Sequence, residues 1–376
     1  MRDLVILGST GSIGVQALEI VRNHPDKFRV VALAAGSSNY PLLAQQAQEF
    51  GVPIVATSGE RSPLTSLIKG EVIDGPSAAS QVASIPCDIV LNGITGSIGL
   101  GPTLSALSSG NKVALANKES LVAGGELVTA FGRDRIIPVD SEHSALAQAM
   151  RSGAVSEIKK VILTASGGPF RKRKELSDVT LEDALAHPTW SMGTVVTINS
   201  ATMVNKGLEV IEAHHLFAIP YRSIETVIHP QSIVHSMIEF KDGSTIAQAS
   251  PPNMKGPIAY AISEGERLSS VMPAIDWSKS SSWDFEPLDN ERFPAVELAK
   301  RCGELGTAVT AMYNAANEEA VAAFITGKIG FLGIVDLLER VVQKLGGGAI
   351  SQVRNLDDVS AIENDARTLA RELMGV

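Results

Sequence analysis

Two carboxylates beside an apolar run are the side chains whose types and spacing suggest chemistry most directly. Asp140 and Glu142 follow the run at 135–139, with Ser141 between them. If the chain stays extended, alternate side chains point to one side, and both carboxylates face the same site. Like charges held close together need a cation between them, and ligands that offer only oxygen favour Mg²⁺ or Mn²⁺ over zinc. The alternative is that Asp140 or Ser141 only caps a helix that begins near Glu142.

A second group of polar side chains lies in the run 200–209. Ser200, Asn205 and Lys206 offer hydroxyl, amide and ammonium donors within two turns of a helix that runs towards residue 216. Glu209 lies one turn further along. It would supply the third carboxylate that the metal site lacks.

Two turns in the same part of the chain are candidates for ligand contact. A strand expected at 161–164 runs into 165–169, where Ser166 and backbone N–H groups could hold phosphate. The loop 187–193 exposes a histidine, a tryptophan and a methionine in a segment that proline and glycine keep from being helical. An exposed aromatic side chain on a loop favours a cover over a ligand. An ordinary turn is the alternative for 165–169.

The N-terminal segment indicates a nucleotide site. The apolar run 4–7 predicts a buried strand, 8–14 a glycine-rich turn, 15–23 a helix and 29–34 a second strand, which together form a βαβ unit. The spacing is G-x-x-G-x-x-G rather than G-x-G-x-x-G. Backbone N–H groups at the start of such a helix suit phosphate. A plain tight turn is the alternative.

The residues after the second strand bear on the choice of cofactor. The stretch 35–39 reads Ala-Gly-Ser-Ser-Asn and has no carboxylate to hold a ribose or repel a 2′-phosphate. Its hydroxyl and amide groups can donate to one. We therefore expect NADP rather than NAD, although no Arg or Lys lies in that stretch.

The elements that must position these groups form a repeating pattern. Further strands are expected at 89–92, 112–116 and 135–139, with helices at 103–109 and 120–131. This alternation predicts an N-terminal Rossmann-like, doubly wound parallel sheet, whose ligand crevice lies beyond the carboxyl ends of the strands. The residues that follow the last two strands would meet there. Lys118 in that position could stabilise an oxyanion, or it could be a surface lysine.

The second half of the chain changes character and predicts an α+β catalytic domain followed by a small helical one. Strands are expected at 194–198, 232–240 and 245–249, the last two joined as a hairpin. A serine-rich stretch at 278–282 reads as a linker. From about 305 onwards the spacing is helical.

Composition limits the function. The 376 residues suggest two or three domains, and a formal charge of −9 gives no basic field for nucleic acid. Cys87 and Cys302 cannot form a disulfide framework, which favours a reducing compartment. No apolar run approaches the about 18 residues that a membrane span needs, and no room for a targeting segment precedes the first strand, so we expect a cytoplasmic protein without a membrane partner. The histidines lack the spacing of a zinc site, but His143 could support the acidic site.

Eight segments, in order along almost the whole chain, resemble the 1-deoxy-D-xylulose 5-phosphate reductoisomerase family. They are LGSTGSIG (7–14), LANKESLV (115–122), PVDSEH (138–143), LTASGGPF (163–170), HPTWSMG (187–193), SATMVNKGLE (200–209), IHPQSIVHSM (228–237) and NAANEEAVAAF (314–324). The resemblance implies an oxidoreductase that isomerises and reduces 1-deoxy-D-xylulose 5-phosphate to 2-C-methyl-D-erythritol 4-phosphate, a step of isoprenoid precursor synthesis. It also implies NADPH, a divalent cation (Mg²⁺ or Mn²⁺, with Co²⁺ as a further candidate) and a homodimer.

The resemblance also implies roles for individual residues. Catalytic residues would be Lys118, Asp140, Glu142 and Glu209, the last three as metal ligands. The substrate would contact Lys118, Ser141, Glu142, Ser166, His187, Trp190, Met192, Ser200, Asn205, Lys206 and Glu209. Cofactor positions would be Gly8, Thr10, Gly11, Ser12, Ile13, Gly36, Ser37, Ser38, Asn117, Glu119 and Gly193. Some relatives place a basic residue where this chain has Ser37.

The expected division has four parts: a NADPH-binding domain at 1–143, a catalytic and connective domain at 144–276 with a flap at about 186–194, a linker at 277–304 and a helical domain at 305–376. Two other functions are alternatives for this sequence. One is another NADP dehydrogenase of Rossmann type, such as a relative of homoserine dehydrogenase, which the flap and the 200–209 segment argue against. The other is a non-catalytic nucleotide sensor, which would not need Lys118 and three carboxylates.

Overall fold

The computed structural model describes residues 1–190, 192–347 and 353–375, which form two compact units. Unit 1 consists of Met1–Ser120, Leu127–Ser144 and Asn253–Pro273, and unit 2 takes the other described residues. Ser191, in the predicted flap, lies outside the described residues, as do 348–352 and 376. The predicted four-part division stays a prediction.

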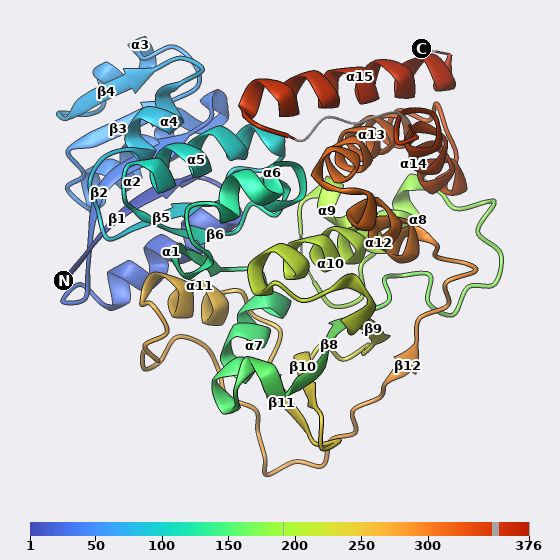
Figure 1. Cartoon of the computed structure of the whole chain (residues 1–376). Coiled ribbons are helices and arrows are strands. Elements are labelled where there is room, and N and C mark those ends of the chain that lie inside the picture. The colour runs from blue at the N-terminus through green and yellow to red at the C-terminus, as the bar shows by residue number, and fades with distance from the viewer. Residues whose placement is uncertain (191, 348–352, 376) are drawn as a thin grey trace. The chain divides into compact units, whose positions relative to one another are not determined.

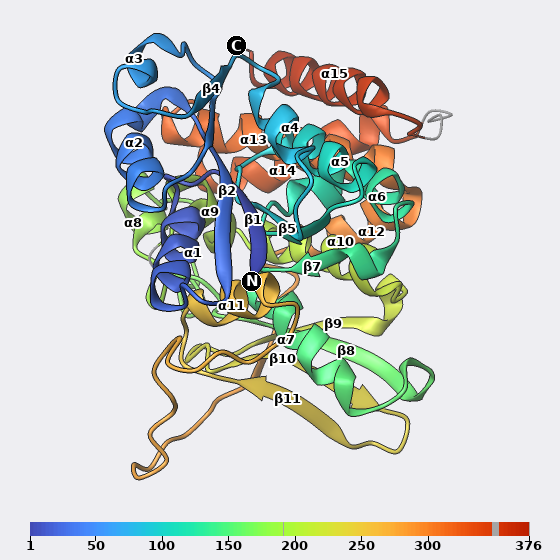
Figure 2. The ribbon, with the colours of Figure 1, turned by 90° about the vertical axis from the view of Figure 1, so that its left-hand side faces the viewer.

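Unit 1 is built on a parallel sheet of seven strands in the order β4-β3-β2-β1-β5-β6-β7. Figure 2 shows β1 and β2 side by side within it. The chain proceeds outwards from β1 to β4, then returns to the other side of β1 and continues from β5 to β7. The carboxyl ends of β1 and β5 therefore flank the point where the strand order reverses, which is the usual ligand site of this fold. The strands are β1 (Arg2–Leu7), β2 (Phe28–Ala35), β3 (Ile54–Thr57), β4 (Glu71–Asp74), β5 (Ile89–Asn92), β6 (Lys112–Leu115) and β7 (Ile136–Pro138).

The helices of unit 1 connect these strands and share a core with them. They are α1 (Ser12–Asn23), α2 (Tyr40–Glu49), α3 (Ser62–Thr65), α4 (Ala78–Ala83), α5 (Leu100–Ser108) and α11 (Lys255–Ile262), while α6 (Glu119–Thr129) and α7 (Ser141–Ala149) contain residues of both units. Although α11 comes late in the chain, its Ile258 and Ile262 are buried in the same core as β1 and α1. The predicted Rossmann-like sheet is confirmed.

Close packing in the first turn depends on two glycines. Gly8 has φ +77°, and a Cβ there would lie 2.7 Å from the carbonyl oxygen of Gly93. A Cβ on Gly14 would lie 2.4 Å from the carbonyl oxygen of Gly8. Both distances are too short for real carbon atoms, so β1, the turn and α1 can approach this closely only with glycine. Helix α1 begins at Ser12, earlier than the residue 15 expected from the sequence.

Unit 2 contains a mixed sheet of five strands in the order β11-β10-β8-β9-β12. The pair β8 and β9 is parallel, and the other neighbours are antiparallel. Figure 1 shows the predicted hairpin of β10 and β11 beside β8. The strands are β8 (Ile158–Ala165), β9 (Ile224–Ile228), β10 (Val234–Phe240), β11 (Thr245–Ala249) and β12 (Glu286–Pro287).

The helices of unit 2 pack with this sheet around one continuous core. Val161 of β8, Ile211 of α10, Tyr313 of α13 and Ala366 of α15 belong to the same buried cluster. The helical C-terminal region is confirmed, and α13 lies beside α14 and α15 (Figure 1). The helices are α8 (Leu181–Leu185), α9 (Thr194–Ala201), α10 (Val204–Phe217), α12 (Ala295–Leu305), α13 (Thr307–Ile325), α14 (Phe331–Leu345) and α15 (Leu356–Met374). Within the described ranges, no helix is both long and apolar enough to span a bilayer.

Two local predictions were wrong. The segment 194–198, expected as a strand because it is rich in β-branched residues, begins α9. The chain is not extended from Asp140 to Glu142 either, because β7 ends at Pro138 and α7 begins at Ser141. The carbonyl of Asp140 accepts a 2.8 Å hydrogen bond from the N–H of Ser144, as the residue before a helix does. Strand alternation therefore does not make the two carboxylates face one site.

Candidate active site

The ends of β6 and β7 bring an ammonium group and a carboxylate together. The strands pair in parallel with Leu115 opposite Pro138, so the residues after them leave the sheet at one edge. Lys118 Nζ and Asp140 Oδ2 lie 2.7 Å apart, with 14% and 17% of the two side chains exposed. This edge of a parallel sheet is where such folds bind ligands. Unit 1 therefore carries a shielded pair of opposite charges at its ligand edge.

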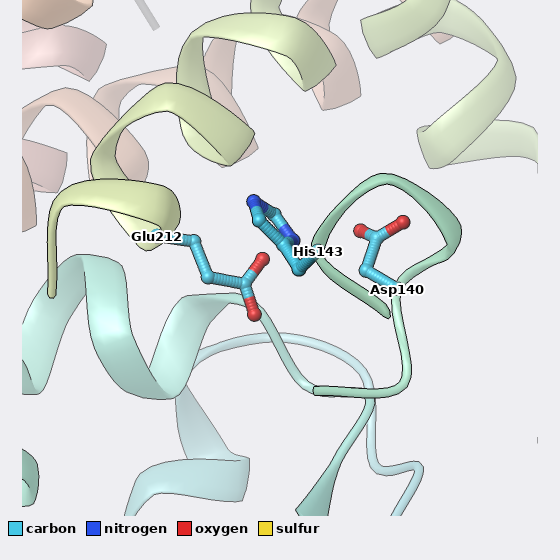
Figure 3. Close-up of side chains that lie close together, drawn as sticks. All are labelled: Asp140, His143 and Glu212. Carbon is cyan, nitrogen blue, oxygen red and sulfur yellow. The ribbon is translucent and has the colours of Figure 1, made fainter. Parts of the chain in front are cut away.

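The first turn of α7 adds further polar groups. The hydroxyl of Ser141 donates to the carboxylate of Glu142, and His143 is fully buried. In Figure 3 the side chains of Asp140 and His143 both leave the chain between the end of β7 and the first turn of α7. An acidic residue in the first turn of a helix is stabilised by the helix dipole. Four predicted or candidate residues are thus held by one strand-to-helix connection.

Asn117 holds the loop that carries Lys118. Its amide nitrogen donates to the carbonyls of Ile94 and Gly96, at 2.7 and 2.9 Å, and to the carboxylate of Glu119 at 2.8 Å. Its oxygen accepts from the N–H of Ser120 at 3.0 Å. Because Asn117 is only 1% exposed, its side chain ties the loop after β5 to the start of α6. The role of Asn117 and Glu119 in binding cofactor stays a prediction.

The other predicted cofactor residues of unit 1 lie in two neighbouring turns. Strands β1 and β2 pair in parallel with Leu7 opposite Ala34, so both turns leave the sheet at the same edge. The first turn holds Gly8, Thr10, Gly11, Ser12 and Ile13, and the second holds Gly36, Ser37 and Ser38. No side chain caps the start of α1, and the residues of the second turn are exposed. This edge offers backbone N–H groups and hydroxyls to an anionic ligand. Gly193, by contrast, precedes α9 in unit 2.

Ser166 and His187 form a hydrogen-bonded pair near the end of β8. The Nδ1 atom of His187 accepts from the backbone N–H groups of Thr189 and Trp190, at 3.1 and 2.9 Å. The proton of the neutral ring is therefore on Nε2, which lies 3.0 Å from Ser166 Oγ and donates to it. Ser166 Oγ also accepts from the N–H of Gly168 at 3.2 Å. Its own proton remains for a ligand such as phosphate.

The charge state of His187 agrees with this arrangement. Burial lowers the pKa of His187 from its ordinary value of 6.5. Protonation would also put a hydrogen on Nδ1, where two N–H groups already donate. The ring is therefore neutral near pH 7.

Lys206, Asn205 and Glu209 form a buried group on one side of α10. The amide of Asn205 donates to Glu209 Oε1, and the ammonium of Lys206 to Glu209 Oε2. Lys206 Nζ also donates to the carbonyl of Thr164 at 2.5 Å. Only 5% and 2% of the side chains of Lys206 and Glu209 are exposed. A carboxylate this deeply buried needs such partners to stay ionised.

The turn between α9 and α10 brings Ser200 to the same region of unit 2. A Cβ on Gly168 would lie 3.0 Å from the carbonyl oxygen of Ser200, so the turn after β8 lies against the end of α9. Met203, in the connection to α10, has φ +63° and is buried. A buried non-glycine residue rarely adopts that conformation unless its surroundings hold it there. Unit 2 thus gathers Ser166, Ser200 and Lys206.

The predicted flap is partly anchored. The side chains of His187, Trp190 and Met192 are half-buried rather than exposed. The rings of Trp190 and His235 meet edge to face, with centroids 6.3 Å apart. The hydroxyl of Thr189 donates to the carbonyl of Pro230 at 3.3 Å. Movement of this loop stays a prediction.

Sequence reasoning overlooked Glu212. This residue is 1% exposed and extends from α10, three residues after Glu209 (Figure 3). Residues three apart lie on one face of a helix, and that spacing is the signal that could have drawn attention to it.

Comparison with known proteins covers nearly the whole chain. Residues 4–125 match the family description "1-deoxy-D-xylulose 5-phosphate reductoisomerase", and residues 136–217 and 249–369 match two descriptions of its C-terminal domains. The reductoisomerase of Streptomyces coelicolor is 53% identical over 99% of this chain and 92% of its own length. That of Leifsonia xyli is 58% identical over 91% of both.

Solved structures of the same enzyme resemble this fold closely. The reductoisomerase of Zymomonas mobilis in complex with NADPH has a TM-score of 0.92 at 39% identity, covering 99% of each chain. A reductoisomerase in complex with NADPH, fosmidomycin and magnesium has a TM-score of 0.92 at 35% identity, covering 100% of this chain and 98% of its own. The chain belongs to the 1-deoxy-D-xylulose 5-phosphate reductoisomerase family.

Proposed function

We propose that this chain isomerises and reduces 1-deoxy-D-xylulose 5-phosphate to 2-C-methyl-D-erythritol 4-phosphate, with NADPH as the reductant and a divalent cation. Family membership along nearly the whole chain supports the proposal. So do relatives solved with NADPH and with magnesium. The single observation that carries it is the shielded Lys118–Asp140 pair at the ligand edge of the parallel sheet. A nucleotide sensor would have no use for such a pair.

We propose Asp140, Glu142 and Glu209 as the ligands of the cation. The family resemblance supports this assignment. All three side chains offer only oxygen atoms, which suits Mg²⁺ or Mn²⁺, whereas a set that included His143 would favour a softer metal. The donor chemistry of Asp140, Glu142 and Glu209 therefore fits the implied cation.

The cation would supply Lewis acidity towards the ketone and hydroxyl oxygens of the substrate. Lys118 would stabilise negative charge that develops on the reacting oxygens, because its ammonium lies among shielded groups where charge interactions are strong. Lys206, whose ammonium group donates to the carboxylate of Glu209, would also offer its charge to the substrate. Ser141 and Glu142 would hold the substrate from the first turn of α7.

Unit 2 would bind the phosphate of the substrate. Ser166 retains a hydroxyl proton to donate, and Ser200, Asn205 and Lys206 add hydroxyl, amide and ammonium donors. Donors of this kind, one of them charged, are what a phosphate group needs. His187, Trp190 and Met192 would cover the substrate and keep water from the reacting carbon atoms.

The cofactor would occupy the edge formed by the turns after β1 and β2. Its pyrophosphate would lie at the start of α1, and its adenosine end at Gly36, Ser37 and Ser38. Asn117, Glu119 and Gly193 would complete the nicotinamide side.

We further propose that Mn²⁺ and Co²⁺ can replace Mg²⁺, and that the enzyme is a cytoplasmic homodimer. Cys87 and Cys302 are both free thiols, which fits a reducing compartment. The homodimer is proposed from the family alone. Analytical ultracentrifugation of the purified chain tests it, with sedimentation as a monomer as the contrary result.

The experiment that tests the function is a single spectrophotometric assay. The purified chain is mixed with NADPH, 1-deoxy-D-xylulose 5-phosphate and MgCl₂, and the absorbance of the reduced nicotinamide is followed. We expect a decay that stops when a chelator is added, resumes with excess Mg²⁺ and yields the branched tetrol phosphate by NMR. No decay, or decay indifferent to the chelator, would refute the proposal.

A further inference from the structure

We propose that Arg61, in the turn after β3, binds the 2′-phosphate of NADPH and thereby sets the preference for NADPH over NADH. The inference rests on the proposed use of NADPH and adds a residue that neither motif nor resemblance had assigned. Three observations support it: the turn after β2 has no positively charged side chain, the turns after β2 and β3 are in close contact, and the guanidinium group of Arg61 is exposed.

The missing charge is at the end of β2. A 2′-phosphate carries between one and two negative charges near neutral pH, and proteins usually meet it with an arginine or lysine. Here the exposed residues after β2 are Gly36, Ser37, Ser38 and Asn39. The side-chain oxygen of Asn39 accepts from the N–H of Leu42 at 3.1 Å and caps α2, which leaves its neutral NH₂ group as a donor. The β2 turn thus offers two serine hydroxyls, one amide and no cation.

The turn after β3 lies directly against those serines. Strands β2 and β3 pair in parallel with Ala35 opposite Thr57, so their turns leave the sheet at one edge. A Cβ on Gly59 would lie 2.6 Å from the Cβ of Ser37, which is closer than real carbon atoms approach. Glycine at 59 therefore lets the two turns touch. Arg61 is two residues further along.

Hydrogen bonds hold this second turn in place. The hydroxyl of Tyr40 donates to the carbonyl of Glu60 at 3.0 Å, and the N–H of Gly59 donates to Thr57 Oγ1 at 3.2 Å. Tyr40 follows the β2 turn directly, so this bond ties the start of α2 to the residue before Arg61. These bonds therefore hold the backbone that leads into Arg61 beside the start of α2.

The guanidinium group of Arg61 has no competing partner among the residues that the structure describes. Arg22 and Arg29, the arginines on the neighbouring α1 and β2, are paired with Glu49 and Asp3. Arg61 is exposed and makes no ion pair or hydrogen bond through its side chain within the described ranges. It is also the only Lys or Arg between Arg29 and Lys69. Because Arg61 makes no such contact within the described part of the chain, its charge is better explained by binding of an anionic ligand than by stabilisation of the fold.

One neighbouring charge opposes the ligand. Glu60 is exposed and directly precedes Arg61. Its carboxylate would therefore repel a 2′-phosphate bound to Arg61, because charges closer than the Debye length of about 8 Å are only partly screened at physiological salt. Replacing Glu60 should therefore strengthen NADPH binding if the phosphate lies here. Replacement of Glu60 and replacement of Arg61 should thus change NADPH affinity in opposite directions, which a general loss of structure would not do.

The test measures dissociation constants of NADPH and NADH, without substrate, for the wild type, Arg61→Ala, Arg61→Lys, Glu60→Gln and Lys69→Ala. Arg61→Ala should weaken NADPH binding by about 10- to 100-fold, the usual effect of losing a charged hydrogen-bond donor, and leave NADH binding unchanged. Arg61→Lys should recover part of the loss. Glu60→Gln should bind NADPH more tightly. Lys69→Ala is the control, because Lys69 is an exposed cation beyond α3 and should change neither constant.

Dissociation constants of 2′,5′-ADP and 5′-AMP for the same variants show the contribution of the 2′-phosphate alone, because the two nucleotides differ only in that group. Equal losses for NADPH and NADH in Arg61→Ala would indicate a structural role, and no loss would leave recognition to the serines; either result overturns the proposal. A wild type that does not prefer NADPH overturns it as well. Failure of the reductoisomerase assay despite a 2′-phosphate preference that Arg61→Ala removes would refute the proposed function and leave this inference standing.

Discussion

At the scale of single residues, Lys206 and Glu209 form an ion pair that is almost fully shielded from water. Removing one member of such a pair leaves the other buried and uncompensated, which costs about 3–5 kcal/mol. The Lys206–Glu209 pair also lies beside the turn that carries Ser166, since Lys206 donates to the carbonyl of Thr164. This location favours a role in ligand binding over a role in stability alone. Exposed ion pairs one helical turn apart contribute about 0.2–0.5 kcal/mol.

If Lys206 binds the substrate phosphate as proposed, Lys206→Ala should raise KM for the substrate by about 10- to 100-fold, because a charged hydrogen-bond donor is lost. Binding of NADPH should be unchanged. Lys300→Ala is the matched control, since Lys300 pairs with Glu297 at the same spacing but at the surface. Steady-state kinetics check both variants, and a KM for Lys206→Ala equal to that of the wild type would remove Lys206 from the phosphate site.

The protonation of His187 gives a pH dependence of known sign. Its pKa is lowered by burial in the folded chain, so the unfolded chain takes up a proton first as the pH falls through 6.5. The stabilising contribution of His187 is thus complete above pH 6.5 and is lost as the pH falls through the lower pKa of the folded state. The ring that anchors Thr189 and Trp190 should then lose those bonds.

We expect KM for the substrate to rise below pH 6.5 in the wild type, with a flatter profile in His187→Gln, whose amide does not titrate. His24→Gln, at the end of α1, should keep the dependence of the wild type. Initial rates at saturating NADPH between pH 5.5 and 8 measure this. Identical profiles for the wild type and His187→Gln would exclude His187 as the cause.

At the scale of elements, the turn between β1 and α1 depends on the absence of a side chain at Gly8. Gly8 and Gly75 both have positive φ, +77° and +94°, but only Gly8 has backbone atoms where a Cβ would stand. Comparing alanine at the two positions separates backbone strain from a steric clash. The strain alone costs about 1–2 kcal/mol.

Gly75→Ala should therefore lose about 1–2 kcal/mol of unfolding free energy and keep NADPH affinity. Gly8→Ala should lose more and bind NADPH at least tenfold more weakly, because the turn must move away from Gly93. Urea denaturation and NADPH titration measure the two effects. Equal behaviour of the two variants would mean that the turn is less tightly packed than its geometry indicates.

The secondary structure was predictable where burial imposes a simple pattern. The parallel strands β1, β2, β5 and β6 each contain a run of at least three apolar residues, and sequence alone located them. Strands β3 and β4 were missed. Strand β4 lies at the edge of the sheet with Glu71 and Asp74 exposed, so it has no buried apolar run, and β3 is the strand that pairs with it. Helix α9 was taken for a strand. Its Thr197 hydroxyl bonds back to the carbonyl of Gly193 at 3.0 Å, so a β-branched residue is accommodated within the helix.

The sequence motifs predicted which residues belong to the candidate site, but not most of the contacts that those residues make. The Lys118–Asp140 pair follows from two neighbouring parallel strands, which sequence could foresee. The hydrogen bond between His187 and Ser166 joins residues 21 positions apart across a loop, and no local pattern indicates it. Arg61 was overlooked because strand β3, which places its turn beside the β2 turn, was not recognised in the sequence.

At the scale of the whole molecule, the chain crosses repeatedly between two units with separate hydrophobic cores. Of the three proposed cation ligands, Asp140 and Glu142 belong to unit 1 and Glu209 belongs to unit 2. We expect NADPH binding to depend mainly on unit 1, because the glycine turn and the Ser37 turn follow neighbouring strands of its sheet. Loss of a metal ligand from unit 2 should therefore leave NADPH affinity intact.

The most direct test of that claim is the number of Mn²⁺ ions bound per chain, measured by EPR with NADPH present. We compare the wild type with Glu209→Gln and Glu212→Gln, two buried acids on the same helix. We expect a single tightly bound ion in the wild type and in Glu212→Gln, and loss of that ion in Glu209→Gln with NADPH affinity intact. Wild-type Mn²⁺ binding by Glu209→Gln, or loss of the ion in Glu212→Gln alone, would contradict it.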